Sequence, residues 1–95
     1  MIRIVWTSQA IQDIEAIRTY IVRDSPHYAA LVTGQIVAAV DRLEDFPLSG
    51  RVVPEFQDEG IREVIIGTYR VVYRVTAEHV QILTVFHASR QLQDL

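Results

Sequence analysis

Three short segments in the last third of the sequence each carry the residue pattern of a β-strand. Residues 61–66, 69–76 and 80–86 are rich in Val, Ile, Tyr and Thr, which suit a half-buried pleated sheet. Two residues separate the first pair of segments and three separate the second pair, so both connections are short enough for hairpin turns. The pattern predicts an antiparallel three-stranded meander.

The middle segment alternates between two kinds of side chain. Tyr69, Val71, Tyr73 and Val75 fall on one face, because successive side chains of a strand point to opposite faces. Arg70 and Arg74 fall on the other face together with Val72 and Thr76. We expect helices to cover the apolar face and the arginine face to stay open.

Two apolar stripes at helical spacing occupy the first half of the chain. The first stripe recurs at spacings of three or four residues and consists of Ala10, Ile14, Ile17 and Ile21. The second has the same spacings and consists of Ala29, Val32, Ile36, Val40 and Leu43. Asp24-Ser25-Pro26 divides them, because Pro26 suits the first turn of a helix and disfavours helical backbone in the residue before it. This arrangement predicts an antiparallel helix hairpin, with the first helix ending at about Asp24 and Ser25 capping the second.

Residues 2–6 alternate like a short strand, and 48–60 have the turn formers and acids of a loop. The opening strand must join the sheet of the meander, since its edge would otherwise be unpaired. We therefore predict a single α+β domain over residues 1–95. It has an opening strand, a helix hairpin and a meander, with one sheet packed on the helices.

The hydrophobic fraction of 49% is high for a chain of 95 residues, because a small core cannot hide so many apolar side chains. A partner protein or a second copy of the chain would cover the excess. Candidates for this interface lie off the two main stripes: Leu31, Val37, Leu92 and Leu95.

The chain has no cysteine, which excludes disulfides and thiolate metal sites, and we expect neither a cofactor nor a metal ion. No segment has the length of a signal peptide or a membrane span, so we expect a cytoplasmic protein with no membrane contact.

Net charge is −3, and all nine basic residues other than histidine are arginines. A nucleic-acid role would therefore need a local arginine cluster or a protein target.

Several basic residues lie in or just after the meander, where they could converge on its open face: Arg62, Arg70, Arg74, His87 and Arg90. An arginine fork grips phosphate or carboxylate, and histidine moves a proton near neutral pH, so such a set is capable of phosphodiester chemistry. It is equally capable of binding acidic side chains of a partner. Ordinary surface ion pairs are the third interpretation.

Short motifs in a consistent order link nearly the whole chain to one family. They are Trp6-Thr7-Ser8-Gln9-Ala10, Asp13-Ile14 with Ile17, Tyr20-Ile21, Pro47, Gly50-Arg51, Pro54-Glu55, Ile61-Arg62-Glu63, the strand from Tyr69 to Val75, and Val85-Phe86-His87 with Arg90. In this combination the chain resembles the RelE/ParE superfamily of bacterial toxins. The resemblance implies a growth-arresting toxin of a type II toxin–antitoxin pair, neutralised by a cognate antitoxin.

The resemblance implies two alternative targets. RelE-like members are ribosome-dependent endoribonucleases that cleave mRNA, and ParE-like members poison DNA gyrase without a catalytic set. If the chain is a nuclease, the carried-over residues are Arg62, Arg70, His87 and Arg90. Val64 stands where a second basic residue is expected and no tyrosine follows Tyr73, so the acid–base set is incomplete.

The ParE-like interpretation is therefore favoured, and its target-binding candidates are Arg51, Arg62, Arg70, Arg74, His87 and Arg90. An inactive module that only binds an antitoxin is a third possibility. On an open arginine face, Arg70→Ala would weaken toxicity and leave the fold intact. Residues 87–95 are expected to be peripheral to the fold and to contribute to toxicity.

Overall fold

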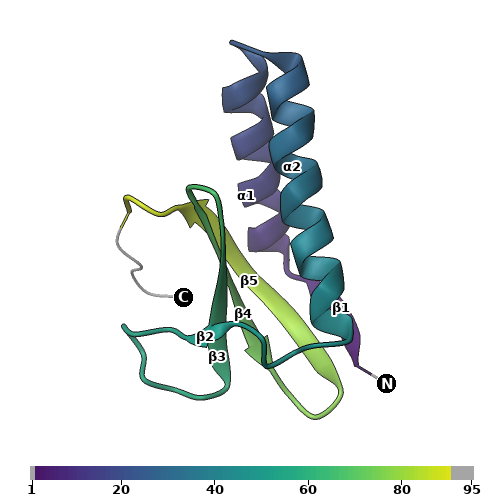
Figure 1. Cartoon of the computed structure of the whole chain (residues 1–95), viewed down its shortest axis with the longest axis vertical. Coiled ribbons are helices and arrows are strands. Elements are labelled where there is room, and N and C mark those ends of the chain that lie inside the picture. Colours follow the sequence, from purple (N-terminus) through teal and green to yellow (C-terminus); the bar gives the residue numbers. More distant parts are fainter. Residues whose placement is uncertain (1, 91–95) are drawn as a thin grey trace.

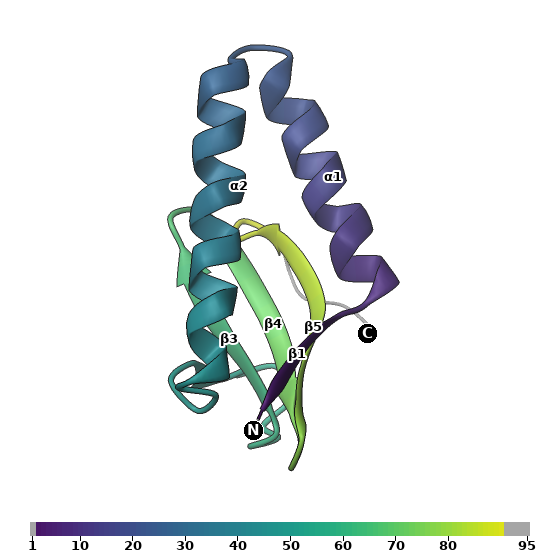
Figure 2. The same ribbon diagram turned by 90° about the vertical axis from the view of Figure 1, so that its right-hand side faces the viewer.

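In the computed structural model, which describes residues 2–90, a helix hairpin lies against one face of a five-stranded sheet (Figure 1). The elements in chain order are β1 (Arg3–Trp6), α1 (Ser8–Val22), α2 (Pro26–Asp41), a short 3₁₀ helix (Arg42–Glu44), β2 (Arg51–Val52), β3 (Ile61–Ile66), β4 (Tyr69–Val75) and β5 (His79–His87). The hairpin extends well beyond the end of the sheet in both views (Figures 1 and 2). The predicted α+β class is confirmed.

The strands follow the order β1-β5-β4-β3-β2. Strands β3, β4 and β5 form the predicted antiparallel meander, and β1 pairs in parallel with β5, so the opening strand does join the same sheet (Figure 2). The expected loop over 48–60 contains one strand that the sequence did not reveal. Arg51 and Val52 pair with Glu63 and Arg62, and a strand of only two residues is too short to show a period.

A hydroxyl side chain caps the start of each helix, and Ser25 caps the second helix as predicted. Thr7 Oγ1 accepts a hydrogen bond from the Ala10 amide at 3.2 Å, and Ser25 Oγ accepts one from the Tyr28 amide at 3.1 Å. The first helix ends at Val22, two residues before the expected end. A Cβ at Gly34 would meet nothing within 4 Å, so this glycine does not serve a close helix contact.

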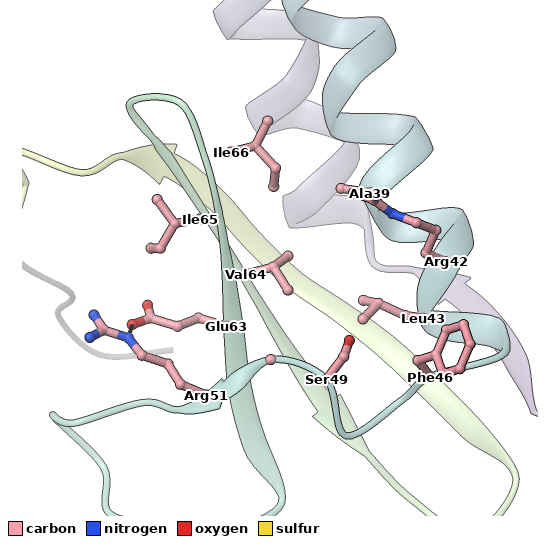
Figure 3. Close-up of a pocket in the computed structure, with 11 residues that line it drawn as sticks. Ala39, Arg42, Leu43, Phe46, Ser49, Arg51, Glu63, Val64, Ile65 and Ile66 are labelled. Carbon is pink, nitrogen blue, oxygen red and sulfur yellow. Dashed lines mark hydrogen bonds and ion pairs between the residues drawn. The ribbon is translucent and has the colours of Figure 1, made fainter.

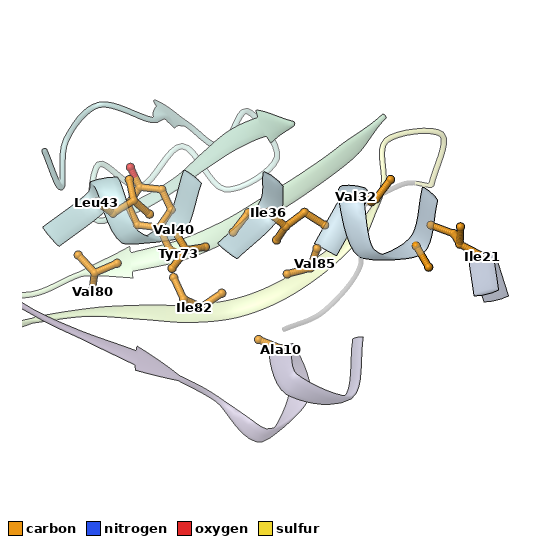
Figure 4. Close-up of a cluster of buried hydrophobic side chains, with 12 residues drawn as sticks. Ala10, Ile21, Val32, Ile36, Val40, Leu43, Tyr73, Val80, Ile82 and Val85 are labelled. Carbon is orange, nitrogen blue, oxygen red and sulfur yellow. The ribbon is translucent and has the colours of Figure 1, made fainter. Parts of the chain in front are cut away.

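The main core lies between the helices and the sheet (Figure 4). Ala10 of α1 and Ile36 of α2 are fully buried and approach the apolar face of the meander, from which Tyr73, Ile82 and Val85 project. The predicted stripes and the predicted apolar strand face are therefore the surfaces that pack. Burial of apolar area of this kind is the dominant favourable contribution to folding.

The opposite face of the sheet is not open, contrary to the expectation from the alternation in β4. The segment 53–60 folds back across it, and Val53 and Phe56 pack against Val72 with three further residues: Ile61, Leu83 and Phe86. Val53 and Val72 are completely buried. The second face therefore has a small core of its own, which a segment without periodicity could not predict.

An irregularity in β5 is tied directly to the first helix. Val72 pairs with Thr84 but Tyr73 pairs with Ile82, so Leu83 is an extra residue in the ladder. Thr7 Oγ1 donates to the Ile82 carbonyl at 2.6 Å. The Asp13 carboxylate of α1 accepts from Thr84 Oγ1 at 2.5 Å and from the Val85 amide at 3.0 Å, so the first helix is hydrogen-bonded to β5 directly after the bulge.

Candidate functional site

The centre of the second sheet face is occupied by a buried ion-pair network and not by free arginines. Glu63 of β3 is 1% exposed, and its carboxylate lies between two guanidinium groups. Arg70 Nε is 2.6 Å from Glu63 Oε1, and Arg51 Nε is 2.6 Å from Glu63 Oε2 (Figure 3 shows the Arg51 pair). Adjacent strands bring these residues together, because Arg51 pairs with Glu63 and Ile65 pairs with Arg70.

The other end of the Arg70 guanidinium is hydrogen-bonded to the segment 53–60, which crosses this face. Nη1 and Nη2 of Arg70 each donate to one oxygen of Glu55, both at 3.0 Å, which is a two-point fork. The guanidinium carbon also lies 5.0 Å from the centre of the Phe86 ring. The hydrogen bonds to Glu55, followed by those to Glu63, raise the pKa of Arg70 above its already high ordinary value.

This geometry corrects the placement of Arg70 as an exposed target-binding residue. It is 8% exposed, and two carboxylates occupy its donors. Bringing a phosphate or a partner carboxylate to it would require displacing Glu55 or Glu63. In this structure Arg70 joins the strap 53–60 to the sheet, which is a structural role.

The two glutamates that hold Arg70 were missed as site residues. A signal for Glu63 was present in the sequence, because an acidic residue stands between Ile61 and Ile65 at alternating positions of an apolar strand. A charge at such a position is buried only when it is paired. No comparable signal marked Glu55, since its partner lies in another element.

Arg62 also has a structural set of contacts. Its Nε donates to the Glu59 carbonyl at 3.1 Å, and Nη1 donates to the Gly50 carbonyl at 3.0 Å and the Leu48 carbonyl at 3.4 Å. The side chain thereby links the two ends of the 48–60 segment. It remains half-buried, so part of it can still meet a partner.

A second connection to this segment comes from the core side of the sheet. Tyr73 Oη donates to the Pro47 carbonyl and accepts from the Gly50 amide, both at 2.9 Å. Burial raises the pKa of the Tyr73 phenol above its usual range. Gly50 is required here, because an added Cβ would lie 2.5 Å from Tyr73 Oη and 2.6 Å from the Glu63 carbonyl oxygen.

The remaining basic candidates are exposed: Arg51, Arg74, His87 and Arg90. Arg74 forms no ion pair with any residue from 2 to 90. The His87 ring stacks edge-on against Tyr69 at 5.6 Å between ring centres, and its Nδ1 is 2.7 Å from Ser89 Oγ. His87 is the last residue of β5, and the Ala88 amide donates to the Thr68 carbonyl, so the expected peripheral segment begins inside the sheet.

The predicted convergence of the basic residues on one face is wrong. Arg70 and Arg74 share the second face, whereas Arg62 pairs with Tyr73 and His87 pairs with Tyr69, which places both toward the helix side. Tyr69 and Tyr73 are four residues apart on β4, or about 13 Å at the rise of a strand. Arg62 and His87 are therefore held near opposite ends of the sheet.

Two of the four predicted apolar partner-binding residues can be placed. Leu31 is 48% exposed and Val37 is 41% exposed, in agreement with their positions off the core stripes. Val37 lines a groove of about 460 Å³ between the helices, together with Arg18 and Val22 of α1. Leu92 and Leu95 lie outside the described residues.

The described part of the chain has neither a cluster of metal-ligating side chains nor a helix suited to spanning a membrane. Among residues 2–90, no three histidine or carboxylate side chains are grouped so that they could hold a metal ion. None of the helices in that range is both long enough and apolar enough to cross a bilayer.

Comparison with known proteins gives consistent relatives. Y4kP of Sinorhizobium fredii, named as a toxin candidate, is 38% identical over 91 residues, covering 94% of this chain and 91% of the relative. Toxin RelE2 of Caulobacter vibrioides is 34% identical over 91 residues, covering 95% and 99% of the two chains.

Solved structures show the same fold. A chain of the chromosomal ParDE toxin–antitoxin system from P. aeruginosa matches with a TM-score of 0.75 and 27% identity, covering 92% of this chain and 96% of that one. The RelBE2 toxin–antitoxin complex from Mycobacterium tuberculosis matches with a TM-score of 0.62, 27% identity and 90% coverage of each chain. The family of ParE toxins of type II parDE toxin–antitoxin systems matches residues 4–92. This chain therefore belongs to the ParE toxin family, within the RelE/ParE superfamily.

Proposed function

We propose that this toxin arrests growth by binding and poisoning DNA gyrase, and that a cognate antitoxin neutralises it. The observation that carries the choice of target is the state of Arg70, one of the four residues that the nuclease interpretation carries over. Its donors are held by Glu55 and Glu63, and its side chain is 10% exposed. A protein target does not need this guanidinium to be free.

The separation of the other basic residues supports the same choice. General acid–base catalysis needs the two groups within hydrogen-bond reach of one reacting centre, about 2.6–3.2 Å. Arg62 is hydrogen-bonded to three backbone carbonyls, and His87, the last residue of β5, pairs with Tyr69 at the far end of the sheet. Arg62 and His87 are therefore too far apart to act as such a pair on a single phosphate.

A surface for a protein target remains available. Arg51 and Arg74 are exposed on the second face, and His87 and Arg90 are exposed where β5 ends. Exposed arginines bind partner carboxylates in two-point contacts that fix orientation. Net charge of the chain is −3, so such contacts are local and do not depend on a general basic surface.

The purified toxin should be added to a gyrase supercoiling reaction and, separately, to translating ribosomes with labelled mRNA. We expect inhibited supercoiling with trapped DNA breaks, and intact mRNA. Cut mRNA with unaffected supercoiling would establish the nuclease instead. Harmless expression of the chain without its antitoxin would favour the inactive binding module.

Variants at exposed residues test the contact surface. Arg74→Ala and Arg90→Ala should each reduce gyrase inhibition without lowering the melting temperature appreciably, because exposed charged side chains add little to stability. Arg51→Ala should also reduce inhibition, but it removes a partner of the buried Glu63 and should lower the melting temperature as well. Arg23→Ala, at the exposed end of α1, is the matched control and should inhibit gyrase as the parent chain does. Full inhibition by a triple variant of Arg51, Arg74 and Arg90 would rule out this surface.

A further inference from the structure

The outer edge of β3 is only partly covered by its neighbour. Strand β2 pairs with Arg62 and Glu63, and among residues 2–90 no strand pairs with that edge beyond Glu63. The Val53 amide donates to the Ile61 carbonyl at 3.1 Å, so the backbone of Ile61 faces the β2 side. Alternation along an antiparallel ladder gives the backbone groups of Ile65 the same direction. The amide and carbonyl of Ile65 therefore face an edge that no strand of residues 2–90 occupies.

A groove runs directly beside this bare edge (Figure 3). It has a volume of about 510 Å³ and lies between the C-terminal end of α2 and β3. Val64 and Ile66 point toward the helix side, where Leu43 and Phe46 lie, and Ile65 points the other way (Figure 3). Phe46, Leu48 and Ile65 are 64%, 61% and 50% exposed, an unusual amount of apolar surface around one strand edge.

The geometry points to strand addition at this edge by an extended segment of the partner antitoxin, with apolar side chains entering the groove and an acidic side chain meeting Arg42 or Arg51. The unpaired N–H and C=O groups of a strand edge are a template for another extended backbone, and pockets for alternate side chains supply specificity. The inference rests on the antitoxin partnership and does not depend on gyrase being the target.

The charge of the groove selects the chemistry of the occupant. Arg42 lines the groove and has no ion pair with any residue from 2 to 90, and Arg51 has a side chain that is 62% exposed. The acidic lining residue, Glu63, is already neutralised by Arg51 and Arg70. An incoming segment with a carboxylate would therefore find a free arginine, and a basic segment would be repelled.

A second copy of this chain fits the edge less well. Symmetric antiparallel pairing centred on Ile65 would place Gly67 of one copy opposite Glu63 of the other, which is already paired with Arg51. Only Val64, Ile65 and Ile66 would be free to pair. Both copies would also bring Arg42 and Arg51 to one seam without any free carboxylate from the groove, so like charges would face each other.

Residue-resolved amide exchange by NMR tests the inference. The probe is the polypeptide encoded by the gene next to that of the toxin, coexpressed and copurified with it. In the complex we expect exchange of the Ile65 amide to slow by about a hundredfold relative to the free toxin, because a new ladder bond would protect it. The proposal would be overturned if exchange at Ile65 were unchanged, or if protection were confined to the β1 edge. It would also be overturned if the two proteins failed to copurify.

A pair of variants separates the backbone contact from the side chain. Ile65→Pro removes the outward N–H without breaking a β3–β4 bond, and should weaken the complex by about tenfold more than Ile65→Ala, which keeps the N–H. Equal affinities of the two variants would contradict strand addition. If Ile65→Pro does not fold, amide exchange on the parent chain still decides the question.

Charge reversal tests the acidic character of the occupant. Arg42→Glu should weaken the complex by about tenfold, whereas Arg23→Glu, which lines neither groove, should leave the affinity unchanged. Equal effects of both reversals would contradict the assignment of a carboxylate to this groove.

Protection of the Ile65 amide in free toxin that rises with toxin concentration would assign the edge to a second copy instead. A negative supercoiling assay would leave all these results unaffected.

Discussion

Glu63 and Arg70 face each other across β3 and β4, with Oε1 of the glutamate 2.6 Å from Nε of the arginine and both side chains buried. The two residues are a diagonal pair, two residues from direct opposition, since Arg70 pairs with Ile65 and Glu63 pairs with Val72. A buried charge requires compensation, and removal of Arg70 would leave the buried Glu63 carboxylate with only the exposed Arg51 as an ion-pair partner among residues 2–90.

Arg70→Ala should therefore destabilise the fold by about 3–5 kcal/mol, the cost of breaking a buried ion pair. Arg74→Ala, four residues along the same strand and exposed, is the matched control and should change the unfolding free energy by less than about 0.5 kcal/mol. Urea denaturation of both variants measures the difference. A fully stable Arg70→Ala that has lost only its toxicity would restore the exposed, target-binding role expected from the sequence.

The two glycines Gly50 and Gly34 should respond to alanine in opposite directions. A Cβ at Gly50 would meet Tyr73 Oη and the Glu63 backbone at 2.5 and 2.6 Å, so Gly50→Ala should cost about 1–3 kcal/mol through overpacking. Gly34 lies in α2 with open space around it, and Gly34→Ala should add up to about 1 kcal/mol through helix propensity. Thermal melts of both variants check the contrast, which fails if the two shift in the same direction.

Asp13 should be a stability residue although it lies on the polar side of α1. Its carboxylate accepts from the Thr84 hydroxyl and the Val85 amide at the β5 bulge, and Asp13→Ala would leave both donors without that acceptor, at a cost of about 1–3 kcal/mol. Asp13→Asn keeps one acceptor oxygen, so its stability should lie between that of the parent chain and that of Asp13→Ala. An exposed acid without such contacts, Asp24, supplies the control, and equal melting temperatures for Asp13→Ala and Asp24→Ala would refute the role.

Stability should decline at alkaline pH because of Tyr73. Burial raises the pKa of its phenol above the ordinary value of 10.0, so above that pH the folded state keeps a proton that the unfolded chain loses. The contribution of Tyr73 is complete below pH 10 and is lost as the pH rises through its folded pKa. Tyr73→Phe should be less stable at neutral pH, because the Gly50 and Pro47 contacts are lost, but should show a shallower alkaline decline in melts. Parallel curves for parent and variant would exclude Tyr73 as the cause.

The sequence alone determined the architecture of the first and last parts of the chain. Helical stripes such as Ala10 to Ile21, and the alternation along β4, are local periodic signals, and a residue's position in such a pattern fixes which face it presents. The caps Thr7 and Ser25 are also local, because each bonds an amide three residues away. These elements, and the family motifs that they carry, could be predicted without any knowledge of distant contacts.

Only the tertiary structure decided the state of the arginines. Alternation placed Arg70 on the second face, but it could not show that the aperiodic strap 53–60 would cross that face and bring Glu55 to the guanidinium. A local pattern tells which way a side chain points, whereas its burial and its partners depend on chain segments far away in sequence. The same reason explains why Asp13, 71 residues before Thr84, was not recognised as an anchor of β5.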